Sequence, residues 1–232
     1  MDWNGNLIFE NLLLAYQGPA ADNTMHAHAS LQITISRQDS IQLVDHQGQI
    51  HCGSVLYVRP GTQHQLQPSE HIVLLLIEPQ SDLARALSDG FGDDDIGQLT
   101  GPYSQIFGAT QSLSDLVTRI GSLANFDTLD SRLSNALNFL ASAPLGNAVK
   151  NAASHCGLSE PRLRAIALKQ LGVPLSKFLL WKAVGRAGRA LLAGNSLADS
   201  AVIGGFSDQA HYTRTMRKLM GITPGQAQHS AV

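Results

Sequence analysis

The residue types best suited to chemistry are concentrated in residues 209–220, a segment near the C-terminus. At helical spacing, Tyr212, Met216 and Leu219 share one face, which predicts that this face packs inward. Gly221 is expected to end the helix. The other positions carry amide, imidazole, hydroxyl and cationic groups, which can bond the edges of bases and phosphate oxygens. They are Gln209, His211, Thr213, Arg214, Arg217 and Lys218.

The charge of the chain is distributed unevenly. Residues 1–128 hold four Lys and Arg against 14 Asp and Glu, whereas residues 129–232 hold 12 against four. Such a split indicates two domains with different tasks. A basic half is typical of nucleic-acid binding, although a soluble domain that is merely basic would have the same composition.

The short hydrophobic runs, the first residues and the cysteine content together predict a soluble cytoplasmic protein. No run of about 18 apolar residues occurs, so we expect no transmembrane helix and no membrane partner. The first residues lack the basic and apolar regions of a signal peptide. Cys52 and Cys156 lie far apart in unlike contexts and suggest no disulfide framework.

The first 80 residues have the pattern of a small β-sandwich or barrel. Short runs rich in Ile, Val and Leu alternate with turn signals such as those around Gly18 and Gly61. In residues 81–127, two segments have helical spacing, and we expect them to pack on the β domain. The predicted strands are Leu7–Tyr16, Leu31–Ser36, Ile41–Val44, Val55–Val58 and Ile72–Ile77, and the predicted helices are Ser81–Leu87 and Leu113–Leu123.

Residues 128–232 are predicted to be entirely helical and to contain an internal repeat. Ser159 and Ser207 occupy equivalent places 48 residues apart, and each follows a Gly-apolar turn between two helices. Two helix-turn-helix units in series are therefore predicted, whereas a single such corner would be a weak signal. The expected helices are Leu129–Ala141, Ala148–His155, Glu160–Leu171, Leu175–Ala193 and Leu197–Ile203, followed by the segment that begins at residue 209.

These residues resemble the DNA-binding domain of the AraC/XylS family of bacterial transcription regulators, over residues of about 129–227. Three groups of residues carry the resemblance. They are Cys156-Gly-Leu-Ser159 with Leu171-Gly-Val-Pro174, the linker with Phe178-Leu-Leu-Trp181, and Gly205-Phe-Ser-Asp-Gln-Ala-His-Tyr-Thr-Arg214 with Gly221-Ile-Thr-Pro224. The resemblance implies two recognition helices joined by a linker helix about 28 Å long, against a groove repeat of about 34 Å.

The resemblance also implies which residues read DNA. The base-reading positions fall on Pro161, Arg162, Arg164 and Ala165 in the first unit, and on Gln209, Ala210, His211, Thr213 and Arg214 in the second. Phosphate contacts are expected from Lys169, Lys182, Arg217 and Lys218. Any one of these side chains could instead be a solvated charge. Pro161 and Ala165 are small or apolar, so the first unit is expected to read fewer bases.

The N-terminal half resembles the cupin-like sensor domains that precede this DNA-binding domain in many family members. In metal-binding cupins, two histidines, an acid and a distant histidine converge, and His26, His28 and His64 match these positions, whereas Gln32 stands in place of the acid. Zn, Ni, Cu or Fe is therefore a possible ligand. The same histidines could line a pocket for an organic effector or an empty pocket, with Gln32 and Arg59 as candidate pocket residues.

The expected fold class is α+β: a cupin-like β-barrel sensor (1–80), a helical linker or dimerisation region (81–127), and a double helix-turn-helix domain (128–232). The expected function is ligand-responsive transcription regulation, with promoter DNA, a second copy of the chain and, for an activator, RNA polymerase as partners. A metal-dependent cupin enzyme with a helical appendage is the alternative, and an adaptor that has lost DNA contact is a third interpretation.

Overall fold

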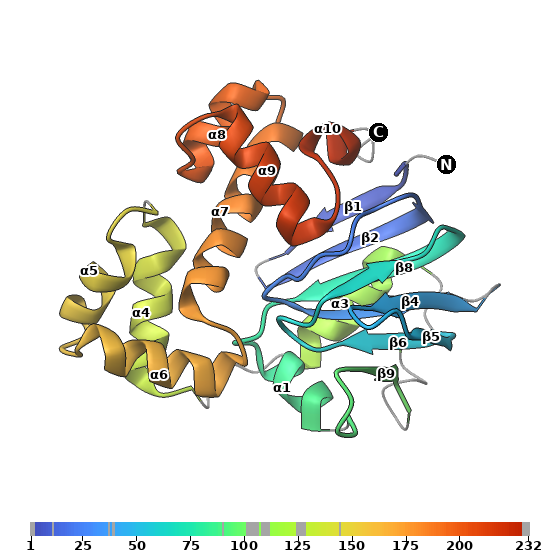
Figure 1. Cartoon of the computed structure of the whole chain (residues 1–232), viewed down its shortest axis with the longest axis horizontal. Helices are drawn as coiled ribbons and strands as arrows, with labels where there is room; N and C mark the ends of the chain where they lie inside the picture. The colour runs from blue at the N-terminus through green and yellow to red at the C-terminus, as the bar shows by residue number, and fades with distance from the viewer. Residues whose placement is uncertain are drawn as a thin grey trace.

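The computed structural model describes residues 3–10, 12–36, 38, 40–89, 91–100, 107, 112–123, 129–143 and 145–228. Within this part of the chain, an N-terminal half rich in β-sheet is followed by a helical C-terminal half, which confirms the predicted α+β class (Figure 1). None of the described helices combines the length and the hydropathy needed to cross a membrane.

Two antiparallel sheets form the N-terminal half. The larger has the strand order β1 (Asn6–Phe9), β2 (Leu13–Ala20), β8 (Ser69–Ile77), β3 (Leu31–Ile35), β6 (Val55–Val58) and β9 (Ile96–Gln98), and the smaller has the order β5 (Ile50–Gly53), β4 (Ile41–Asp45) and β7 (His64–Leu66). Residues of both sheets share one hydrophobic core. Within the described residues the sheets do not close, so the expected barrel is corrected to two facing sheets.

Strand β3 shows how the larger sheet separates its two faces. Ile33 and Ile35 lie in the core beneath α1 (Asp82–Asp89) and α3 (Leu113–Leu123). Gln32 and Thr34 alternate with them and are nearly inaccessible to solvent. Because successive side chains of a strand point to opposite faces, these two polar side chains face away from the α1 and α3 side. The sheet is therefore apolar on the side of α1 and α3 and partly polar on the other side.

Some strands were not predicted from the sequence. The strands β5 and β7 are only four and three residues long, so neither shows a clear hydrophobic run. The expected single strand Leu7–Tyr16 is two strands, because the chain turns between β1 and β2. Residues 96–98, inside the stretch expected to be a helical linker, form β9 and pair with β6.

The helices of the C-terminal half follow the predicted repeat closely. Helix α6 begins after its cap at Ser159 and ends at Gly172, as expected from these two residues. Helix α9 is capped by Asp208 and ends at Gly221. Its described helices are α4 (Ser131–Ser142), α5 (Ala148–His155), α6 (Glu160–Leu171), α7 (Leu175–Leu192), α8 (Leu197–Gly204), α9 (Gln209–Met220) and α10 (Pro224–Gln228).

The C-terminal half is docked on the sheets through α7 and the end of α9 (Figure 1). The ammonium group of Lys182 in α7 lies 2.7 Å and 2.9 Å from the carboxylate oxygens of Glu78, at the end of β8. The backbone N–H of Thr24 donates to the carbonyl oxygen of Gly221 at 2.9 Å. Apolar residues of α7, α8 and α9 join the core that the two sheets share. We call this whole surface the docking contact.

Gly221 offers a test of the docking contact. Gly172 and Gly221 end helices α6 and α9, both with φ of 73°. A Cβ at Gly221 would lie 2.6 Å from both His26 Nδ1 and the oxygen of Thr24, whereas a Cβ at Gly172 would meet nothing within 4 Å. Gly172→Ala should lower the free energy of unfolding by about 1–2 kcal/mol, the cost of a left-handed backbone. Gly221→Ala should lower it by clearly more, because the neighbours must also move. Equal losses in denaturant titrations of the two variants would contradict the close contact.

Candidate functional site

The two helix-turn-helix units have equivalent recognition helices, α6 and α9. Each helix is capped by a side-chain oxygen: the backbone N–H of Arg162 donates to Ser159 Oγ at 3.4 Å, and that of His211 donates to Asp208 Oδ1 at 2.7 Å. Each helix is preceded by a shorter one, α5 or α8. The repeat found in the sequence is therefore a repeat of structure. Each recognition helix ends at a glycine in the left-handed conformation, Gly172 in the first unit and Gly221 in the second.

Helix α9 separates its apolar and polar faces as predicted. Tyr212, Met216 and Leu219 are buried. Of the residues expected to read DNA, Gln209, Arg214, Arg217 and Lys218 are exposed, and His211 and Thr213 are partly exposed. None of the three cations forms a salt bridge within the described residues, although the charge of Arg214 helps to lower the pKa of Asp208. These side chains can therefore meet phosphates.

His211 is more constrained than the other predicted contacts of α9. Its Nδ1 lies 3.1 Å from the hydroxyl oxygen of Ser207, and its ring lies edge-on against Phe206, with 5.2 Å between the ring centroids. These contacts fix the ring near the start of the helix. Its remaining nitrogen is then the group that can meet a base or a phosphate.

Helix α6 has fewer side chains than α9 that are available to contact DNA. Arg162, Arg164 and Lys169 are exposed, as expected for DNA contacts. The guanidinium of Arg164 is paired with Glu160 on the same helix, with 2.5 Å between Nη2 and Oε1. That ion pair must rearrange before Arg164 can bond a base. The first unit therefore has fewer immediately available contacts than the second, in line with the small side chains of Pro161 and Ala165.

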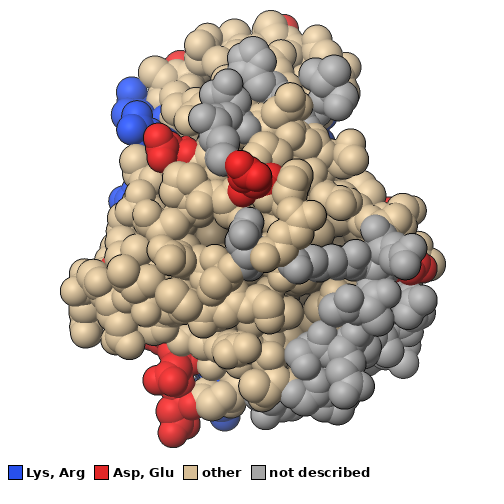
Figure 2. Space-filling model, turned by 90° about the vertical axis from the view of Figure 1, so that its right-hand side faces the viewer, with Lys and Arg blue, Asp and Glu red and all other residues tan. Residues whose placement is uncertain are grey.

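Two cations of α7 connect parts of the protein. The guanidinium of Arg186 donates to the carbonyl oxygens of Ala141 at 2.8 Å, Ala143 at 3.3 Å and Gly204 at 2.9 Å. It thereby ties the end of α4 in the first unit to the end of α8 in the second. Lys182, predicted to contact phosphate, is instead bound to Glu78 in the docking contact. On the face drawn in Figure 2, Lys and Arg are few and lie near the edge, so the basic surface does not gather there.

Three histidines from two segments of the chain meet inside the docking contact. His26, His28 and His64 are all buried, and one ring nitrogen from each lies within 4.8 Å of the others. His26 and His64 are joined by an isolated β-bridge. Gln32 is part of the group, because its Oε1 lies 3.0 Å from Nε2 of His28 and 3.1 Å from Nε2 of His64. The convergence predicted for these four residues is thus present.

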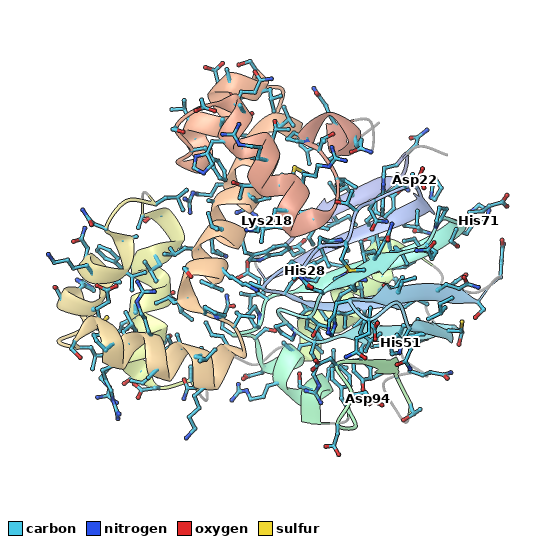
Figure 3. All side chains as sticks on the ribbon, in the orientation of Figure 1. Asp22, His28, His51, His71, Asp94 and Lys218 are labelled. Atoms are coloured by element: carbon cyan, nitrogen blue, oxygen red, sulfur yellow. The ribbon has the colours of Figure 1, made fainter. Side chains whose placement is uncertain are left out.

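The histidine cluster lies directly beneath the C-terminal half. The rings of His28 and Trp181 of α7 have centroids 5.8 Å apart. Gly221 lies against His26, as described above. Figure 3 shows His28 near the boundary between the sheets and the C-terminal helices, apart from His51 and His71. The cluster is therefore covered by the C-terminal half instead of opening to solvent.

Burial keeps these histidines uncharged. It lowers the pKa of His26 to about 3, with a further contribution from His28, while the hydrogen bond to Thr24 acts in the opposite direction. Burial also lowers the pKa of His28, and burial together with the two neighbouring histidines lowers that of His64. Neutral imidazoles are the form that binds metal ions.

A pocket that was not predicted lies between the sheets and the C-terminal helices. Its walls are mainly apolar and include Trp3, Tyr16 and Trp181, and its volume is about 110 Å³. Gly185 and Gly188 of α7 also line it, and side chains there would fill part of the space. Each glycine inside a helix lowers its stability by about 1 kcal/mol relative to alanine. Two of them in one helix were therefore the signal in the sequence that could have indicated this pocket.

Arg59, a candidate for the effector pocket, lies elsewhere. Its guanidinium donates to the carbonyl oxygens of Asp94 at 3.1 Å and Gly92 at 2.7 Å and covers the ring of Phe91. It fixes the segment before β9 and does not line the pocket between the halves. Gln32, the second candidate, belongs to the histidine cluster.

The buried histidines predict a dependence of stability on pH. The unfolded chain binds protons at histidines below about pH 6.5, while folded His26 stays neutral down to about pH 3. The stabilising contribution is therefore complete above pH 6.5 and is lost on acidification, by about 1.4 kcal/mol per pH unit for each such histidine. Denaturant titrations at pH 7.5, 6.5 and 5.5, with a chelator present, measure this loss in the free energy of unfolding. A free energy of unfolding that stays constant from pH 7.5 to 5.5 would contradict the assignment.

Comparisons with known proteins agree with this architecture. Residues 152–230 match the family model of a helix-turn-helix domain. An apo variant of ToxT from Vibrio cholerae has a similar structure, with a TM-score of 0.61 and 12% identity over 99% of this chain and 100% of that chain. Wild-type ToxT bound to an unsaturated fatty acid has a TM-score of 0.57 and 12% identity, over 94% and 95% of the two chains. No curated protein matches the sequence.

A further similar structure is a transcriptional regulator from Chromobacterium violaceum with an AraC-type DNA-binding domain, at 24% identity and a TM-score of 0.40 over 42% of this chain and 89% of that one. The family match covers both helices of the second unit and most of the first. Residues 152–230 thus match a helix-turn-helix domain, in a chain whose overall fold is similar to that of ToxT.

Proposed function

We propose that this protein is a sequence-specific DNA-binding transcription regulator, controlled by an effector that acts on the docking contact. The observation that carries the proposal is the placement of α9. Its cationic and amide side chains are exposed, while its C-terminal end is held against the sheets through Gly221. A change in the docking contact therefore acts directly on a helix equipped to read DNA.

The pocket between the halves is the site that we assign to the effector. It is mainly apolar, and its charged lining residues are Lys182 and Arg189 with Glu10 and Glu78. Because Lys182 is already paired with Glu78, Arg189 is the cation that we assign to an acidic head group. The hydroxyl of Tyr212 also lies there and has no hydrogen-bond partner among the described residues. A long apolar molecule with an acidic head group fits this combination, because its body would replace water and its head would meet these polar groups. ToxT has been solved with an unsaturated fatty acid and with a naphthalenyl butenoic acid.

The size of the pocket suggests how an effector would act. Ligand pockets usually measure about 300–1,000 Å³, whereas this one measures about 110 Å³. A long-chain acid would have to widen it, and its walls belong to both halves of the protein. Effector binding and the docking contact are then coupled, and the coupling is reciprocal. Homodimerisation, and contact with RNA polymerase if the protein activates transcription, complete the proposal.

The alternative of a metal-dependent cupin enzyme is less well supported. A substrate would have to reach the histidine cluster, but His26, His28 and His64 are at most 8% exposed and lie beneath Gly221 and Trp181. That alternative also leaves the exposed basic face of α9 without a role.

The proposal is tested by measuring binding to fragments of the promoter upstream of the gene at several salt concentrations. Replacing Arg214 by Ala should weaken specific binding by about 1–3 kcal/mol if it bonds a base. Arg217→Ala should weaken binding to all sequences and make it less dependent on salt. Arg85→Ala, in α1 and paired with Asp82, is the control and should leave binding unchanged. Absence of binding at low salt would refute the proposed function.

The effector site is tested with oleate as the probe. The chain has two tryptophans, Trp3 and Trp181, and both line the pocket, so tryptophan fluorescence should respond to oleate. Gly188→Leu should fill the space and weaken oleate binding at least about tenfold. Ser176→Leu, at an exposed position of the same helix, is the matched control. An unchanged oleate titration in Gly188→Leu would rule out this pocket as the site.

A further inference from the structure

We propose that His26, His28 and His64 form a binding site for a divalent transition-metal ion inside the docking contact. One nitrogen of each ring lies within 4.8 Å of the others. In a tetrahedral zinc site with bonds of about 2.0–2.1 Å, ligand nitrogens are about 3.3 Å apart. The ring nitrogens therefore need to approach one another by at most about 1.5 Å to bind an ion.

The backbone already fixes the protons of these rings in the form that binds metal. Nδ1 of His26 lies 2.8 Å from the carbonyl oxygen of Thr24, that of His28 lies 3.0 Å from Ser30 O, and that of His64 lies 3.0 Å from Thr62 O. Since a carbonyl oxygen can only accept, each Nδ1 carries the proton. Each neutral ring then has its lone pair on Nε2. Such contacts are the usual outer shell of metal-binding histidines.

The hydrogen bonds around Gln32 are consistent with these lone pairs once the oxygen and nitrogen of its side-chain amide are exchanged. Its Oε1 lies near Nε2 of both His28 and His64, and its Nε2 lies 3.0 Å from the hydroxyl of Thr34. Oxygen and nitrogen of a glutamine amide are assigned from their partners. Turning the amide over directs its NH₂ group at the two imidazole lone pairs and lets Thr34 donate to the oxygen. The amide therefore occupies the place of an ion that the lone pairs of His28 and His64 face.

The composition of the cluster indicates the class of ion. Imidazole suits Zn, Cu, Ni and Fe, and three histidines leave a fourth position for water or another ligand. No carboxylate belongs to the group within the described residues. Hard ions such as Ca²⁺ and Mg²⁺, which need several oxygen ligands, do not fit. A neutral ligand set leaves the charge of the ion uncompensated, so we expect weaker binding than in a site with a carboxylate.

The surroundings make this site part of the docking contact. Gly221 covers His26, Trp181 lies against His28, and Gly61, three residues before His64, would place a Cβ 3.0 Å from Val173. All three covering residues, Gly221, Trp181 and Val173, belong to the DNA-binding half. An ion enters when this contact opens. The ring movements that bind it take place directly beneath the DNA-binding half.

The test uses the full-length protein after removal of metals by a chelator. Co²⁺ is the probe, because its visible absorption distinguishes four-coordinate from six-coordinate sites. We expect one equivalent to bind with a four-coordinate spectrum and to be displaced by Zn²⁺. His28→Asn should abolish this binding. His51→Ala and His71→Ala remove histidines outside the cluster and should retain it.

A gain-of-affinity variant covers the case in which His28→Asn does not fold. Gln32→Glu restores a carboxylate at the place of the amide and should raise the affinity for Co²⁺ at least about tenfold, since the carboxylate compensates the charge of the ion. It should also give a larger rise in Tm on addition of Zn²⁺ than the wild type. The proposal is overturned by the absence of saturable Co²⁺ binding to the wild type, by its survival in folded His28→Asn, or by an unchanged affinity in folded Gln32→Glu.

Discussion

Glu78 and Lys182 form an ion pair that joins the two halves of the protein, with side chains only 11% and 14% exposed. Charges withdrawn from water this far carry a desolvation cost of several kcal/mol each, and only a close partner offsets it. Separating the halves leaves each charge without its partner and exposes the apolar core that they share. The arrangement of the DNA-binding half therefore depends on whether this contact is formed, and partial separation is unfavourable.

The two helix-turn-helix units do not respond to that contact independently. Arg186 bonds the ends of α4 and α8 at once, and three carbonyl oxygens share its guanidinium. Such charge-assisted hydrogen bonds resist changes in the relative positions of the units. Helices α7 and α9 contact the sheets, so a displacement there is passed to α4 in the first unit through Arg186. The rigid connection is inside the DNA-binding half, and the adjustable connection is at its boundary with the sheets.

Local signals in the sequence predicted local structure well. Ser159 with Gly172 defined α6, and the histidine spacing with Gln32 located a cluster that the structure assembles. Strands such as β5 were missed because they carry no hydrophobic run, and the closed barrel was wrong because strand pairing is not determined by local pattern. The docking contact could not be predicted, since Glu78 and Lys182 are separated by 104 residues. A lysine in a basic half is ordinarily a surface charge, so its partner could only come from the three-dimensional arrangement.

Trp181 connects the two sites that we assign within the docking contact. Its side chain lines the apolar pocket, and its ring also lies against His28. An acid that widens the pocket would move this ring, and so would an ion that draws His28 inward. Two ligands that alter one shared contact must affect each other's affinity, with the same factor in both directions. Each can shift the docking equilibrium only by the difference between its affinities for the docked and separated states. The size of that difference, and not the tightness of binding itself, determines which ligand controls access of α9 to DNA.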